Sequence, residues 1–195
     1  MRLNSQQIFL ASKSPRRAEI LTQMGISYDI IQVSVPEILA TNELCEDYVF
    51  RLAQEKAQAG LDSRSEEDLL VIGADTVIFF NDRILEKPKN EQEAFKMLSS
   101  LSNNTHLVKT AVSVCNRIHC QTIVQTSRVT MANLSRSEIS DYWKTSEPCD
   151  KAGGYAIQGK GAIFIKHIEG SYSGIMGLPI YETARLLNKF GIKSE

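Results

Sequence analysis

The sequence predicts an α/β protein in which helices cover a mixed, twisted sheet in three layers. Apolar strand patterns alternate with amphipathic helix patterns through the first hundred residues, and a long hairpin pattern then spans residues 106–132. The 195 residues contain 43% hydrophobic side chains, and no linker or repeat divides them. We therefore expect a single domain over residues 1–195, with one core.

The first half of the chain begins with a short apolar strand at 7–11. A helix over 15–24 follows, with Ser14 as N-cap, Pro15 at the first helical position and Gly25 as the stop. An extended segment is expected near 28–34, and a helix within 42–61. The run "LLVIGADTVIFF" at 69–80 predicts a buried strand with a tight turn into a short returning strand.

The second half carries clear helix starts. Asn90 and Glu93 predict a capping box, as do Ser135 and Glu138. The hairpin over 106–132 should turn near 116–117. A strand over 162–168 and a last helix over about 179–189, separated by glycine-rich segments, complete the prediction.

Charge and hydropathy argue against two classes of protein. The net charge is −1 and the pI about 6.3, so no basic field is available for a nucleic-acid backbone. The longest apolar run is too short to span a bilayer and carries an acid, and the N-terminus lacks a signal-peptide pattern. A cytoplasmic protein is the simplest interpretation.

The four cysteines form no CxxC pair, so we expect reduced, packed thiols. Cys115 and Cys120, with His119 between them, are the alternative as metal ligands. The second half of a zinc-type motif is missing, however, and the segment alternates like a hairpin.

Two arginines occupy the first turn of the helix predicted at 15–24. The helix dipole favours anions there, so Arg16 and Arg17 each cost a few tenths to about one kcal/mol if nothing binds. Both side chains could simply point into water. The strand–turn–helix context favours instead a phosphate held by free backbone N–H groups and guanidinium forks. On this interpretation, replacing either arginine with alanine leaves the empty protein no less stable.

Asp75 lies inside the apolar run at 69–80, where an unpaired carboxylate costs several kcal/mol. The alternative is a partly solvated acid at the end of the strand. That position is also where open α/β sheets bind ligands. Glu37 is a candidate second carboxylate for a metal ion, although by sequence it also fits an ordinary surface glutamate.

Lys56 and Lys87 are cations near predicted element ends, and either also fits a solvated surface lysine. The segment "GYAIQGKG" imitates a phosphate-binding loop. Gly161 stands where that motif needs Ser or Thr, so it is not one.

Several segments together resemble the Maf family of nucleoside triphosphate pyrophosphatases, in its dTTP/UTP branch. They run in the family's order over nearly the whole chain: "LASKSPRRAEIL", "YVFRLAQEKA", "VIGADTVI", "KPKNEQEAFKML", "THLVKTAVSV" and "DKAGGYAIQGKGAIFIKHIEGSYSGIMGLP". The resemblance implies an inosine-triphosphatase-like fold, a cytoplasmic homodimer, and hydrolysis between the α- and β-phosphates with a divalent cation. That cation is expected to be Mg²⁺, with Mn²⁺ or Co²⁺ as alternatives.

The resemblance also implies roles for individual residues. Asp75 falls at the family's proton-acceptor position. The other matched positions are the specificity residues Arg16, Thr76 and Gln158, and the phosphate and metal residues Ser14, Arg17, Glu37, Lys56 and Lys87. Magnesium binds through one or two carboxylates plus substrate phosphates, which suits Glu37 and Asp75. Asp75 either accepts a proton from water or holds the metal, and both roles stay open.

Base choice is expected to depend on Gln158. Its amide can donate to O4 and accept from N3–H of uracil or thymine, but turned over it would match cytosine. Discrimination therefore needs a neighbour that pins the amide, such as the Thr76 hydroxyl or the backbone of "GYAIQG". The alternative function is a nucleotide-binding regulator of cell division and septum formation without significant turnover.

Overall fold

A computed structural model describes residues 6–193, and these residues form two compact units. Unit 1 holds the described residues up to Asp75, together with Thr110–Gln125 and the chain from Gly177 onward. Unit 2 holds Thr76–Lys109 and Thr126–Met176. The strands β3 (Leu69–Phe80), β5 (Thr105–Cys115) and β6 (Cys120–Met131) contribute residues to both units. The prediction of a single domain stays a prediction.

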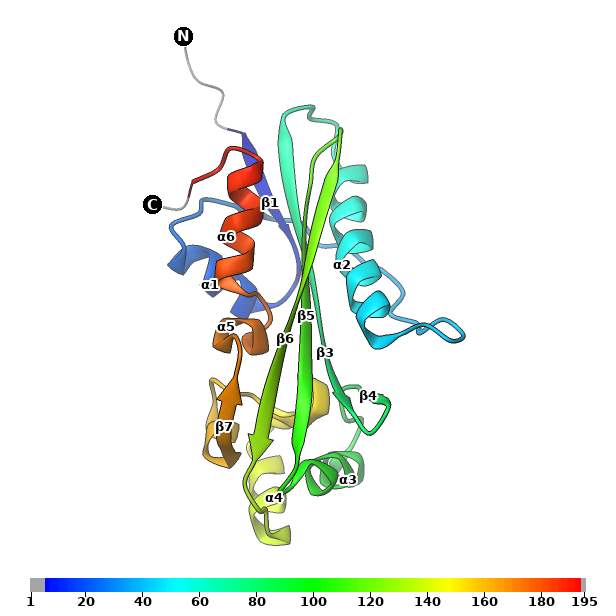
Figure 1. Cartoon of the computed structure of the whole chain (residues 1–195), viewed down its shortest axis with the longest axis vertical. Coiled ribbons are helices and arrows are strands. Elements are labelled where there is room, and N and C mark those ends of the chain that lie inside the picture. The colour runs from blue at the N-terminus through cyan, green and yellow to red at the C-terminus, as the bar shows by residue number, and fades with distance from the viewer. Residues whose placement is uncertain (1–5, 194–195) are drawn as a thin grey trace. The chain divides into compact units, whose positions relative to one another are not determined.

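The predicted α/β class is confirmed. A seven-stranded sheet has the order β2-β1-β3-β5-β6-β7, with β4 paired to β3, and helices flank it (Figure 1). It is a mixed sheet, because β1 pairs in parallel with β2 and β3, whereas β3–β4 and β6–β7 are antiparallel. The other strands are β1 (Gln7–Ala11), β2 (Asp29–Ile30), β4 (Arg83–Leu85) and β7 (Ile165–Glu169).

In unit 1, the helices lie on both sides of β1. Figure 1 shows α1 (Pro15–Gln23) and α6 (Ile180–Lys189) to one side and α2 (Cys45–Asp62) to the other. The buried face of α2 joins a core with the strands and with Cys115. This core consists of Phe9, Ala11, Ile31, Ala57, Leu61, Leu69, Val71 and Cys115. Burial of each large aliphatic side chain in it contributes about 1.5–3 kcal/mol.

Helix α2 packs unusually close to β3, and Gly73 makes this approach possible. A Cβ at Gly73 would lie 2.3 Å from the Ala53 carbonyl oxygen and 2.5 Å from the Ala57 nitrogen. Both are backbone atoms, so no side chain can move aside to make room. The glycine two residues before Asp75 therefore brings α2 directly against the strand that carries Asp75.

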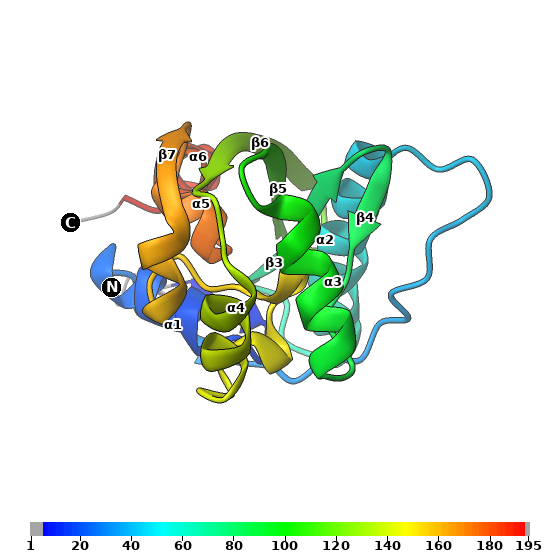
Figure 2. The ribbon, with the colours of Figure 1, turned by 90° about the horizontal axis from the view of Figure 1, so that it is seen from below.

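In unit 2, α3 (Glu91–Leu101) and α4 (Arg136–Trp143) lie side by side (Figure 2). The predicted capping box at Ser135 and Glu138 is confirmed in full. The one at Asn90 is only half formed. The Asn90 side chain accepts from the Glu93 backbone N–H at 3.0 Å, but the Glu93 carboxylate accepts from Lys89 N–H instead of from Asn90.

Two predicted strands are shorter than expected. The extended segment near 28–34 pairs only at Asp29–Ile30. The strand expected over 162–168 begins as a 3₁₀ turn, Lys160–Phe164, and β7 starts at Ile165. The Ala162 N–H donates to the Gly159 carbonyl at 3.1 Å, which closes this turn. Glycine-rich sequence ahead of the apolar run lets the chain coil before it extends.

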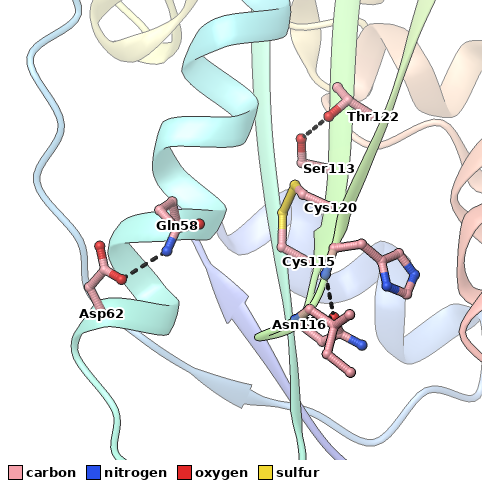
Figure 3. The surroundings of a disulfide bond; sticks show 9 residues. Gln58, Asp62, Ser113, Cys115, Asn116, Cys120 and Thr122 are labelled. Carbon is pink, nitrogen blue, oxygen red and sulfur yellow. Dashed lines mark hydrogen bonds between the residues drawn. A yellow bond between two sulfur atoms is a disulfide. The ribbon is translucent and has the colours of Figure 1, made fainter.

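The expectation of reduced thiols is wrong for two of the four cysteines. Cys115 and Cys120 form a disulfide across the hairpin between β5 and β6 (Figure 3). A tight turn, in which Asn116 N–H donates to His119 C=O at 3.0 Å, places the two residues opposite each other. Two residues further along each strand, the hydroxyls of Ser113 and Thr122 lie 2.5 Å apart. Cys45 and Cys149 are free thiols.

Candidate active site

The predicted phosphate and metal residues of unit 1 gather near the carboxyl end of β1. Ala11 pairs with Gly73 in parallel register, so the segments that follow these two residues leave the pair in the same direction. After Ala11 the chain passes through Ser12 into α1, and two residues after Gly73 comes Asp75. The start of α1 and the buried carboxylate are thus near neighbours in unit 1.

Asp75 is buried, with 6% of its surface exposed, and it is paired. The Lys56 ammonium donates to Asp75 Oδ1 at 2.7 Å and to Glu37 Oε1 at 2.6 Å. The prediction that Asp75 needs a partner is confirmed, and the alternative of a solvated surface lysine is wrong for Lys56. One cation and two carboxylates from three separate segments therefore converge on a single point.

The position of Lys56 follows from the packing of α2. Lys56 precedes Ala57, whose backbone nitrogen lies where a Cβ at Gly73 would clash. The close approach of α2 at Gly73, two residues before Asp75, therefore places the Lys56 ammonium beside β3. The side chain is only 12% exposed. Desolvation of this kind is tolerated only where opposite charges compensate for it, as the two carboxylates do here.

Glu37 lies on the long loop ahead of α2, and Arg51 ties this loop to the helix. The guanidinium of Arg51 donates to both oxygens of Glu43, at 2.6 and 2.8 Å, and to the Ile38 carbonyl at 3.0 Å. The bonds that Glu43 accepts from Arg51, and then from the Ala40 N–H, lower its pKa to about 2. A fixed carbonyl directly after Glu37 restricts where its carboxylate can reach. Arg51 was not among the residues predicted for the site.

Arg17 makes hydrogen bonds within the chain. Its Nε donates to the Gly177 carbonyl at 2.8 Å, and its Nη1 donates to Ser12 Oγ at 3.1 Å. Burial lowers the pKa of the guanidinium, and the charges of Asp75 and Glu37 oppose that shift. The side chain therefore anchors the segment around Gly177 to the start of α1. The expectation that its removal leaves the empty protein no less stable does not fit this arrangement.

For Arg17→Ala we expect a loss of about 2 kcal/mol in the free energy of unfolding, because hydrogen bonds from a charged donor are lost. Urea unfolding without nucleotide measures this. Lys13→Ala is the matched control, since it removes the same charge from an exposed position before α1. Equal stability of the two variants would show that the Arg17 contacts contribute nothing to folding. For Arg16, unchanged stability stays a prediction.

The first turn of α1 also borders an open pocket of about 680 Å³. Ser14, the N-cap, lines it, together with Ser12, Lys13 and the apolar surfaces of Ala18 and Ile30. The Ser14 side chain makes no capping bond, and its backbone N–H donates to Ser12 Oγ at 3.1 Å. Of the predicted site residues, only Ser14 lines this pocket.

The remaining predicted residues belong to unit 2. Thr76 is the first residue of that unit and follows Asp75 along β3. Lys87 and Gln158 are both exposed. Within residues 6–193, the Gln158 amide has no hydrogen-bond partner, so its pinning by a neighbour stays a prediction for the nucleotide-bound protein.

Two residues around Gln158 escaped prediction from the sequence. The Tyr142 hydroxyl and the Glu147 carboxylate bind the backbone of the loop that carries Gln158. The only signal for them is composition, namely an acid and a tyrosine shortly before a glycine-rich segment. A sequence pattern does not say which backbone groups such residues will meet.

Comparison with known proteins identifies the family of the chain. The family described as Maf-like protein matches residues 7–190. A protein from Methylobacillus flagellatus named dTTP/UTP pyrophosphatase is 47% identical over 98% of this chain and 96% of its own length. One of the same name from Vibrio parahaemolyticus is 46% identical over 95% and 98%, and one from Alkalilimnicola ehrlichii is 47% identical over 95% and 93%. With matches that cover nearly its whole length, the chain belongs to the Maf family.

Proposed function

We propose that this chain is a pyrophosphatase that hydrolyses dTTP and UTP between the α- and β-phosphates. Water is consumed, and the products are the nucleoside monophosphate and pyrophosphate. The observation that carries the proposal is Lys56 held between the carboxylates of Glu37 and Asp75, beside the arginine-bearing start of α1. The names of the relatives supply the substrate class.

Phosphate binding is assigned to cations and to the start of α1. The first N–H groups of a helix and its dipole favour an anion. Arg16 and Arg17 bring guanidinium groups to this turn, and Ser14 adds a hydroxyl. The family resemblance also assigns Lys87, which is exposed in unit 2, to phosphate binding. Fixed cations stabilise charge that builds up on the departing pyrophosphate.

Asp75 is assigned as the proton acceptor. Its Oδ1 accepts a hydrogen bond from the Lys56 ammonium. Phosphate oxygens that arrive at Lys56 compete for the same ammonium hydrogens. We infer that substrate binding draws Lys56 toward phosphate and leaves the Asp75 carboxylate able to take a proton from the attacking water.

The donor set at Glu37 and Asp75 fits Mg²⁺. Both carboxylates already face one cation, the Lys56 ammonium, and hard oxygen donors are what this metal prefers. Residues 6–193 contain no group of three or more metal-binding side chains. A site that takes its other ligands from water and substrate phosphates needs no more than two carboxylates. When bound, the metal would neutralise phosphate charge and lower the pKa of water. Mn²⁺ or Co²⁺ would suit the same donors.

The test is a nucleotide panel with purified protein. UTP, dTTP, CTP, ATP and GTP are each incubated with MgCl₂, and pyrophosphate release is measured. We expect fast release from UTP and dTTP, slow release from CTP, and no release in excess EDTA. Tight binding of UTP without pyrophosphate release would favour the alternative, a regulator of cell division that binds nucleotides without turnover.

Gln158→Ala tests how the base is selected. We expect slower UTP hydrolysis and a smaller ratio of UTP to CTP turnover, because the amide no longer matches O4 and N3–H. A site whose polar groups are left unpaired by the wrong base can disfavour that base by a factor of about 10⁴ in kcat/KM. This factor is the upper limit for the fall in the UTP-to-CTP ratio. Gln58→Ala, an exposed glutamine on α2 bonded to Asp62, is the matched control. An unchanged ratio in folded Gln158→Ala protein would place base reading elsewhere, for instance at Arg16 or Thr76.

The remaining proposals are a cytoplasmic location, a homodimer, and no binding to nucleic acid. Among residues 6–193, no helix is long and apolar enough to cross a membrane. Exposed apolar side chains on the loop ahead of α2, Ile38, Leu39 and Leu44, give a second copy an apolar surface to cover. Sedimentation velocity measures the oligomeric state directly. The net charge of −1 argues against a nucleic-acid partner.

A further inference from the structure

Gln158 lies at the tip of a tight turn in unit 2. The Gly159 N–H donates to the Ala156 carbonyl at 3.3 Å, so Ile157 and Gln158 are the two central residues of the turn. Gln158 is exposed, and its side chain makes no hydrogen bond to the described part of the chain. The backbone of the turn therefore sets where the Gln158 side chain starts and in which direction it leaves the loop.

That backbone is held on both sides of Gln158 by two side chains. The Ala156 N–H donates to the Tyr142 hydroxyl at 3.1 Å. The Lys160 and Gly161 N–H groups donate to the two oxygens of Glu147, at 2.9 and 3.0 Å. The Tyr142 hydroxyl in turn donates to Glu147 at 2.6 Å, which joins the two halves. We call Tyr142 and Glu147 the loop clamp.

The glycines of the loop allow the clamp to approach closely. A Cβ at Gly159 would lie 2.3 Å from Glu147 Oε2, and one at Gly161 would lie 2.6 Å from the Tyr142 oxygen. Tyr142 itself is rigidly placed, because it is buried and its ring packs edge-on against Phe164. The loop backbone therefore lies directly on a fixed support.

One member of the loop clamp, Glu147, is a charged hydrogen-bond acceptor. Burial raises the pKa of Glu147, but the Tyr142 hydroxyl and the N–H groups of Gly161 and Lys160 outweigh it, so the pKa lies below its ordinary value. Glu147 is thus ionised at neutral pH, and hydrogen bonds to an ionised acceptor are about twice as strong as neutral ones. Burial and the contact with Glu147 raise the pKa of Tyr142, which stays a neutral donor.

We propose that Tyr142 and Glu147 are positioning residues for base selection, which fix the turn so that the Gln158 amide meets uracil or thymine in one orientation. This rests on the proposed function. The free amide can match cytosine as readily as uracil when turned over. A fixed backbone does not by itself stop the amide from turning over. It holds the backbone groups of the turn, which are candidates for pinning the amide, in one place before the nucleotide arrives, and it reduces the ordering that binding requires.

The test compares Tyr142→Phe and Glu147→Gln with the unmodified protein. Each keeps the shape of its side chain and removes part of the clamp. We expect the UTP-to-CTP ratio of kcat/KM to fall about tenfold, the worth of one hydrogen bond of moderate strength. Inorganic tripolyphosphate, which has no base, should inhibit all three proteins with the same Ki.

Glu138→Gln is the matched control. It removes a carboxylate from α4 that also makes two short hydrogen bonds, at 2.6 and 2.7 Å to Ser135. It should lower the melting temperature without changing the UTP-to-CTP ratio. This separates a loss of positioning from a general loss of stability in the α4 region.

A second arm places each clamp variant in the Gln158→Ala background. If the clamp acts through Gln158, neither variant changes the ratio further there. The positioning role is overturned if the UTP-to-CTP ratio falls in Gln158→Ala but in neither folded clamp variant. That result leaves the proposed function standing. A clamp effect that persists without Gln158 also overturns the positioning role. An unchanged ratio in Gln158→Ala contradicts base reading by Gln158, and this inference fails with it.

Discussion

Asp75→Asn is expected to lower kcat for pyrophosphate release from UTP by at least about 100-fold, because a general base contributes factors of 10²–10⁴. The amide keeps the shape of the carboxylate but cannot accept a proton from water. It can still accept a hydrogen bond from Lys56, which lies 2.7 Å from Oδ1. Steady-state kinetics with UTP and Mg²⁺ measures the effect, with circular dichroism as the check on folding.

The control for this variant is Asp62→Asn. Asp62 is an exposed carboxylate at the end of α2 that accepts from Gln58, so the same chemical change should leave turnover as it was. Release from folded Asp75→Asn within a few-fold of the unmodified protein would contradict the assignment. Asp75 would then be the buried half of a structural ion pair with Lys56.

Much of the fold was predictable because its signals are local. The Ser135 and Glu138 box needs only two side chains three residues apart, and it forms as predicted. The run over Leu69–Phe80 is apolar or small except at Asp75 and Thr76, so its burial as a strand needs no knowledge of its neighbours. Pro15 marks the first helical position of α1 for the same reason.

Contacts between distant segments were not predictable in the same way. Arg17 bonds to Gly177, which lies 160 positions further along the chain, so its structural role has no local signal. The disulfide depends on hairpin register, because a shift by one residue would separate Cys115 from Cys120. The Asp75 carboxylate signalled that a partner was needed, but not that Lys56 would supply it.

The glycine at 73 is a signal that could have been used. A glycine inside an apolar strand indicates that another backbone approaches closely. Here it is the backbone of α2, and Lys56 arrives with it. The same reasoning applies to Gly159 and Gly161, whose missing side chains leave room for Glu147 and Tyr142. In both places the glycine shows that something is near, whereas the identity of the neighbour comes from the fold.

Lys56→Met should have two large effects. It leaves Asp75 buried without its ammonium partner, and breaking a buried pair costs about 3–5 kcal/mol of stability. We also expect kcat/KM for UTP to fall by about 100-fold or more, because one fixed cation for the phosphates is gone. Chemical unfolding without nucleotide measures the first effect, and steady-state kinetics measures the second.

Magnesium provides a third measurement on the same variant. In the unmodified protein the ammonium lies within 2.7 Å of both carboxylates, so Mg²⁺ alone is expected to change the Tm little. In Lys56→Met, Glu37 and Asp75 lack that cation, and Mg²⁺ should raise the Tm by binding to the folded state. Lys96→Met, on the exposed face of α3, is the control for the added methionine. Only Lys56→Met, which leaves this carboxylate pair without its ammonium, should show a higher Tm with Mg²⁺. Equal Tm shifts in all three proteins would contradict Glu37 and Asp75 as a metal site.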